Sequence, residues 1–171
     1  LFESVARYYV PDDIFRQRIS PELVDKGWFL TARNITRATD ERTAIAAVIP
    51  RTASCEVTPY VEVDGPAENA GFLAGALNSF VLDYVARQKV GGTHLSYFIL
   101  YQLPLIPPRG LAVFSETAIV QRILELTYSS WSLQAFSIDC GWDGPPFRWD
   151  EQRRFLIRCE LDAAFFHLYL P

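Results

Sequence analysis

Methionine is absent from this chain of 171 residues, although ordinary composition would supply roughly three or four. The sequence starts at Leu1 rather than at an initiator methionine, and we expect it to be a piece of a longer polypeptide. No apolar run reaches the roughly 18 residues that cross a bilayer. No basic segment followed by an apolar one opens the chain, so we expect neither a secretory signal nor a membrane partner.

Cysteine is also scarce, and Cys55, Cys140 and Cys159 lie far apart. An odd and scattered set argues against a disulfide framework and fits a reducing cytoplasm, which is the location we predict. The chain has no Cys-x-x-Cys pair and no histidine–cysteine cluster of the kind that a zinc site requires. We therefore expect no metal and no cofactor in this fragment.

Basic residues are fewer than acidic ones, which gives a net charge of −4 and a pI near 5.2. The imbalance is uneven, because residues 1–110 carry a net charge of −1 and residues 111–171 carry −3. The first part is therefore the better candidate for a nucleic-acid face, although the low pI counts against strong binding by this fragment alone. Half of the residues are hydrophobic, which suffices for one buried core.

The first part of the chain predicts strands followed by a helix. Residues 28–36 and 43–49 are strand-like and flank a polar stretch, so they predict a hairpin with a charged tip. Residues 57–63 predict a third strand, which Pro59 places at a sheet edge. Residues 68–88 then predict one helix, because apolar residues recur there at helical spacing. Its apolar face consists of Leu73, Leu77, Phe80, Val81 and Tyr84.

After that helix, residues 95–106 predict a further extended segment. Ser115 and Asp150 are the expected N-caps of two later helices. The broad apolar face of the last helix is expected to contain Phe155, Cys159, Phe166 and Tyr169. This layout predicts an α+β fold: a mixed sheet with a central helix in residues 1–110, followed by a helical C-terminal extension, residues 111–171, packed on it.

Two segments form cationic islands in this acidic chain. Residues 84–109 contain Arg87, Lys89 and Arg109 with no acidic residue, and residues 26–51 hold five basic residues against two acidic ones. Cations attract DNA phosphates, and Arg and Asn read base edges through paired hydrogen bonds. We predict that both segments share one DNA-binding surface. The candidate residues are Arg33, Asn34, Arg37, Thr39, Arg42, Arg87, Lys89, Gly91, Gly92, Thr93 and His94.

These features also have structural interpretations. Gly91 and Gly92 are typical of a left-handed helix C-cap, or they let the backbone approach DNA closely. They do not form a P-loop, because the order helix, glycines, strand is reversed. Residues 40–42 are also typical of a solvated turn with local ion pairs. His94 lacks a nearby nucleophile motif, so catalysis would require a pocket that gathers it with carboxylates such as Asp83 or Glu41.

Three blocks of the sequence together resemble a known family. They are RNITRATDERTAIAAVIPR, LAGALNSFVLDYVARQKVGGTHLSYFILYQLPLIPP and GWDGPPFRWDEQRRFLIRCELDAAFFHLY. In this order they resemble the C-terminal region of large restriction–modification proteins, the adenine-specific DNA methylases whose methylase domain is followed by a target-recognition region. The middle block is also similar to a segment of the specificity domains of type I systems. The resemblance extends from Trp28 to Tyr169.

The resemblance implies a target-recognition fold that binds the DNA major groove and performs no chemistry itself. In the family, methylation uses S-adenosylmethionine bound by a glycine-containing motif, together with an Asn-Pro-Pro-Tyr-type motif, and neither is present here. Gly144 precedes Pro145 and Pro146 but has no side-chain acceptor, so this segment predicts a rigid turn. The implied partners are double-stranded DNA and the methylase domain of the parent polypeptide, which would hold the S-adenosylmethionine.

Two other functions stay open. The tail contains Trp131, Trp142 and Trp149, and exposed aromatic surfaces often bury against protein partners. The alternative function is therefore a protein–protein interaction module that uses the aromatic helical tail. An enzyme is the third hypothesis, and it depends on a pocket around His94.

Overall fold

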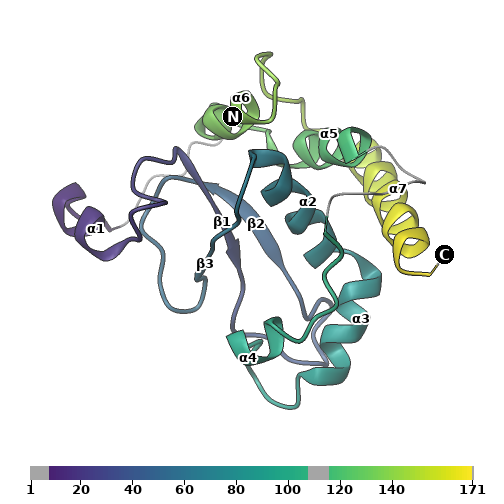
Figure 1. Ribbon diagram of the computed structural model, residues 1–171. Helices are drawn as coiled ribbons and strands as arrows, with labels where there is room; N and C mark the ends of the chain where they lie inside the picture. Colours follow the sequence, from purple (N-terminus) through teal and green to yellow (C-terminus); the bar gives the residue numbers. More distant parts are fainter. Residues whose placement is uncertain (1–7, 108–115, 171) are drawn as a thin grey trace.

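The computed structural model describes residues 8–107 and 116–170. Within them the chain forms an α+β fold with a three-stranded antiparallel sheet, seven α-helices and one 3-10 helix (Figure 1). The strands are β1 (Trp28–Ala32), β2 (Ala46–Pro50) and β3 (Tyr60–Val61). The helices are α1 (Asp12–Arg18), α2 (Ala67–Leu77), α3 (Phe80–Lys89), α4 (Tyr97–Leu100), α5 (Glu116–Thr127), the 3-10 helix η1 (Trp131–Leu133), α6 (Gln134–Asp139) and α7 (Glu151–Tyr169).

The predicted hairpin is confirmed, because β1 and β2 pair antiparallel with Leu30 opposite Val48. β3 pairs with the other side of β1, so the strand order is β2-β1-β3 and the segment after Pro59 is a sheet edge, as predicted. The prediction of a mixed sheet is wrong for the described residues, since both pairings are antiparallel.

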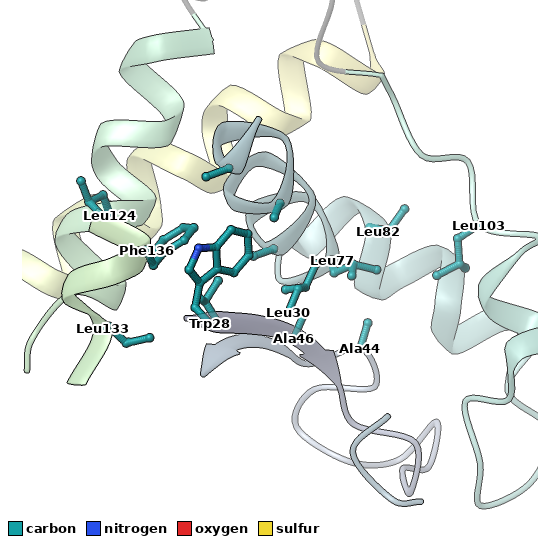
Figure 2. Packing of buried hydrophobic residues seen from close by; sticks show 14 of the residues in the cluster. Trp28, Leu30, Ala44, Ala46, Leu77, Leu82, Leu103, Leu124, Leu133 and Phe136 are labelled. Carbon is teal, nitrogen blue, oxygen red and sulfur yellow. The ribbon is translucent and has the colours of Figure 1, made fainter. Parts of the chain in front are cut away.

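All five residues of β1 are buried, because both faces of the sheet are covered. Phe29 packs on one face in a small cluster with Phe15 and Leu23 from the N-terminal segment. Trp28 and Leu30 point to the other face, which α2 covers (Figure 2). This two-sided burial explains why the strand has a continuous apolar run rather than an alternating one.

The single helix predicted over residues 68–88 is wrong, because it is broken at Asn78 and Ser79 into α2 and α3. The Asn78 side chain bonds the edge of β2: its Oδ1 accepts from the Ala46 N–H at 3.2 Å and its amide donates to the Ala46 carbonyl at 2.8 Å. Ser79 Oγ caps α3 by accepting from the Leu82 N–H. The break shifts the helical phase, so Phe80 and Tyr84, both expected in the apolar face, are exposed.

The extended segment predicted over residues 95–106 is also wrong in its central part. The chain turns at Ser96 into α4, with the Leu100 N–H donating to the Ser96 carbonyl at 2.9 Å. Aromatic and β-branched residues favour a strand, but among the described residues the strand pairing here is one isolated bridge, between His94 just before this segment and Ile35. Ile99 and Leu100 instead pack against the core from one side of a short helix.

The C-terminal helices cover the side of α2 away from the sheet, with α5 on α2 and α7 on α5 and α3 (Figure 1). The Asp150 cap is confirmed, since its Oδ1 accepts from the Arg153 N–H at 2.8 Å. The expected cap Ser115 and the cation Arg109 lie outside the described residues.

The apolar face predicted for α7 is wrong in part, because Phe155, Cys159 and Phe166 are exposed. Tyr169 is half-buried and packs against the core. Both faces of this helix carry apolar residues, and the sequence alone did not distinguish them. The residues that α7 buries are Ile157, Leu161, Ala164 and Phe165.

The main core takes residues from both sides of the expected boundary at residue 110. Trp28 of β1 packs edge-on against Phe136 of α6 with their rings 4.9 Å apart (Figure 2). The Trp28 indole also donates to the Asp139 carboxylate at 2.7 Å. Leu124, Tyr128 and Leu133 join the same cluster, so the helical extension is packed into the core of the sheet-bearing part.

Candidate nucleic-acid interface

Backbone pairing brings the two predicted cationic segments together. The Thr36 N–H donates to the Thr93 carbonyl at 3.0 Å, and the Leu95 N–H donates to the Asn34 carbonyl at 2.8 Å. Between these bonds lies the bridge of Ile35 with His94. The loop after β1 and the bend after α3 are therefore neighbours, near the lower end of the sheet in Figure 1.

Asp83 of α3 holds the loop from inside the protein. This carboxylate is 4 % exposed, and its Oδ1 accepts from the Thr43 N–H at 2.6 Å and the Ala44 N–H at 2.8 Å. Its Oδ2 accepts from Arg87 Nη2 at 3.0 Å. A buried carboxylate of this kind is stable only when its oxygens are satisfied, and here three donors satisfy them.

Arg87 extends the same contact to the tip of the loop. Its Nη1 donates to the Ala38 carbonyl at 2.7 Å and its Nη2 to the Glu41 carbonyl at 2.9 Å. The side chain is 30 % exposed, so part of the guanidinium still reaches solvent. Arg87 thus shapes the loop, and its expected contact with a phosphate stays a prediction.

Arg33 also supports the loop internally. Its Nη2 donates to Thr36 Oγ1 at 3.1 Å and to the Arg42 carbonyl at 3.0 Å, and it lies 3.5 Å from an Asp40 carboxylate oxygen. The Arg37 N–H donates to the same carboxylate at 3.1 Å. The expected turn is therefore present with one local ion pair, between Arg33 and Asp40, and it rigidifies the segment that carries Arg37.

Arg42 is directed toward α7 rather than toward the bend. Its guanidinium lies 3.9 Å from the centre of the Phe80 ring, and Nη2 is 3.8 Å from Asp162. Asp162 also accepts from the Phe80 N–H at 2.8 Å. Burial raises the pKa of Asp162, and the Phe80 N–H and the Arg42 charge oppose that shift.

The remaining candidate residues are exposed, except Asn34. Lys89 Nζ lies 3.5 Å from Gln102 Oε1, and His94 Nδ1 lies 2.9 Å from Thr93 Oγ1. Asn34 is half-buried, and its Oδ1 has no hydrogen-bond partner among the described residues. The exposed candidates are Arg37, Thr39, Lys89, Gly91, Gly92, Thr93 and His94. Glu41 is exposed beside them, so the surface is cationic but not uniformly so.

The double-glycine bend has no internal requirement for glycine. The left-handed C-cap considered for it is wrong, since the glycines with positive φ among the described residues are Gly65 and Gly141. α3 ends instead at Val90 in extended conformation. A Cβ atom built on Gly91 or Gly92 would meet no described residue within 4 Å. The fold leaves the backbone of this bend open to approach from outside.

Comparison of the chain with protein-family models, curated proteins and solved structures finds no match. The family resemblance of the sequence therefore stays a prediction. Among residues 8–107 and 116–170, no helix has the length and apolar character needed to cross a membrane. Within the same residues, no group of His, Cys, Asp and Glu side chains has a metal-binding arrangement.

Sequence reasoning missed the structural roles of Asp83, which holds the loop, and of Asn78, which ties α2 to β2. An available signal for Asp83 was an acidic residue one helical turn before Arg87, within a helix rich in apolar residues. No comparable signal identified Asn78, because its partner Ala46 is 32 residues away in the sequence. Both oxygens of Asp83 already accept hydrogen bonds from the loop and from Arg87, so Asp83 is not free to act as the carboxylate partner of His94 in catalysis.

Proposed function

We propose that this fragment recognises double-stranded DNA for a restriction–modification adenine methylase whose methylase domain lies elsewhere in the parent protein. The observation that carries the proposal is the open glycine bend held beside an arginine-bearing loop. Backbone without side chains permits close approach of a DNA strand, and flanking cations attract its phosphates. The sequence resemblance supplies the family, and the geometry supplies a surface consistent with it.

The candidate residues divide into three roles in this proposal. Arg33, Arg42 and Arg87 set the shape of the loop through internal contacts. Arg37 and Lys89 neutralise phosphates from the surface. The remaining residues approach base edges or let the DNA strand come close, and these are Asn34, Thr39, Gly91, Gly92, Thr93 and His94. S-adenosylmethionine belongs to the methylase domain of the parent protein in this account.

The methylase domain would contact the outward face of α7. This face carries an apolar stripe of residues four or three positions apart, with Phe155 57 %, Phe166 51 % and Leu170 57 % exposed. Cys159 and Ala163 are also exposed and lie between them. Such a stripe on a helix is typical of a surface that is covered by another protein domain.

The test is the salt dependence of duplex binding by the whole chain. The affinity should fall with rising salt, and Arg37→Ala and Lys89→Ala should each reduce the slope of log affinity against log salt by about 0.9. The matched control is Arg148→Ala, which removes an exposed cation from the turn before α7 and should leave the slope unchanged. If the slopes of the Arg37→Ala and Lys89→Ala variants equal that of the unchanged chain, Arg37 and Lys89 are excluded as phosphate contacts.

A second candidate function is a protein–protein interaction module. The exposure of Trp131 and Trp149, at 54 % and 62 %, favours it together with the stripe on α7. A chain that binds no duplex at low salt, but captures a partner protein through this surface, would support the second function instead of the first.

A further inference from the structure

The short helix α4 presents aromatic rings to solvent beside the glycine bend. Phe98 is 77 % exposed, Tyr101 84 % and Tyr97 54 %, and none of the residues of α4 is buried. Rings this exposed leave apolar surface in contact with water, and packing within the fold does not account for their position. The surface is a candidate binding site separate from the loop and the bend.

The rings stand on a fixed base. Ile99 and Leu100 pack against the core, and Leu103 is buried within it (Figure 2). The Gln102 amide donates to the Phe98 carbonyl at 3.0 Å, which secures the turn after α4. Because Ile99 and Leu100 already fix the backbone of α4 against the core, a ligand that binds its exposed rings would not have to order the helix first.

The geometry of the rings suits flat ligands. The rings of Tyr97 and Tyr101 lie 6.4 Å apart with an angle of 26° between their planes, so they are nearly parallel. Aromatic rings exposed in this way offer faces on which a planar base can stack, and stacking of bases on protein rings does not depend on base identity.

The charges near the end of α4 favour a nucleic-acid strand over a protein. Lys89 reaches Gln102, and the described residues from Tyr84 to Pro107 include no acidic residue. Tyr97 also lines a pocket of about 330 Å³ together with Glu56 and Glu62, which would repel phosphates. The proposed site therefore consists of the two more exposed rings, Phe98 and Tyr101.

We propose that Phe98 and Tyr101 bind unpaired bases of a nucleic-acid strand, with Lys89 contacting its backbone. Aromatic platforms combined with cations are the usual means of binding single strands. This inference takes its ligand class from the proposed function, because α4 begins three residues after His94 at the duplex-binding bend. It adds that DNA opened next to the duplex is held by the same protein.

The experiment compares two labelled probes by fluorescence anisotropy: an oligothymidylate of about twelve nucleotides, a length within single-strand site sizes, and a blunt duplex. Phe98→Ala with Tyr101→Ala should weaken binding of the single strand by roughly tenfold for each ring, while duplex affinity stays within about twofold. The control, Phe155→Ala with Phe166→Ala, removes two exposed rings from α7 and should change neither affinity.

The outcomes separate this inference from the function on which it rests. Unchanged single-strand affinity in the α4 variant overturns the aromatic platform and leaves duplex recognition standing. An equal loss for both probes also overturns it, because the rings would then belong to the duplex site. If the chain binds the single strand but no duplex, the proposed duplex recognition is contradicted and the binding of unpaired bases by Phe98 and Tyr101 is supported. Concentration-dependent self-association abolished by the α4 variant, without single-strand binding, would assign the rings to a protein contact.

Discussion

Asp83 and Arg87 lie one turn apart on α3, with a carboxylate oxygen of Asp83 3.0 Å from Nη2 of Arg87. Both residues also bond the backbone of the loop between β1 and β2, Asp83 at Thr43 and Ala44 and Arg87 at Ala38 and Glu41. The conformation of this loop is therefore determined by a helix some forty residues further along the chain.

Replacing Asp83 with alanine should lower the free energy of unfolding by about 3 kcal/mol, because it leaves buried donors without partners. The donors are the N–H groups of Thr43 and Ala44 and the guanidinium of Arg87. Urea denaturation followed by circular dichroism measures this change. Asp83→Asn is the matched control, since it keeps an acceptor and should be milder. A loss below about 0.5 kcal/mol in the alanine variant would contradict the role of this carboxylate.

Alanine at Gly91 and Gly92 should weaken duplex binding without harming the fold. Neither glycine has a positive φ, and added Cβ atoms would meet no other group among the described residues. Stability should stay the same or rise by about 0.4–1 kcal/mol per site, because alanine restricts the unfolded chain. Thermal unfolding and duplex titration of the double variant test both halves. A stable variant with wild-type affinity would remove the bend from the interface.

A chain shortened to residues 1–110 should not fold cooperatively. It would lack Leu124, Tyr128, Leu133 and Phe136, which belong to the same buried cluster as Trp28. Uncovering that cluster exposes apolar surface worth roughly 25 cal/mol for each Å². The urea transition of the shortened chain is the measurement. A sharp transition resembling that of the full chain would mean that the first part is an independent domain.

The cysteines should differ in reactivity toward iodoacetamide. Burial, aided by the nearby carboxylates Glu68 and Asp139, raises the pKa of Cys140 to about 12, so little thiolate forms near neutral pH. Hydrogen bonding from the backbone of Val57, with the Thr58 hydroxyl, lowers the pKa of the exposed Cys55. Mass spectrometry of the native protein at pH 8 should find Cys55 alkylated well before Cys140. The reverse order would contradict the burial of Cys140.

Local sequence patterns predicted the hairpin, the edge position of the third strand and the Asp150 cap, because each depends on residues close in sequence. It failed where distant contacts decide the structure. The break between α2 and α3 depends on Asn78 bonding to β2, and no local pattern contains that bond. Residues 97–100 have strand-like side chains but no neighbouring strand to pair with, so they form a helical turn.

The candidate site could be predicted in its position but not in its internal organisation. Charge along the sequence indicated both segments, and the structure brings them together. Which arginines are exposed could not be predicted, because Arg33 and Arg87 have their partners in backbone carbonyls that only the folded loop provides. The open space around Gly91 and Gly92 likewise follows from the packing of α3 and α4 and not from the glycines themselves.

The most direct test of duplex recognition is an NMR titration of the isotopically labelled chain with a blunt DNA duplex at low salt. The account predicts that backbone amide signals of Arg37, Thr39 and residues 91–94 shift during the titration and recover when salt is added. Signals from the outward face of α7, including Phe155 and Phe166, should not move. Shifts confined to α7, or no shift at residues 91–94 at a saturating duplex concentration, would contradict the account.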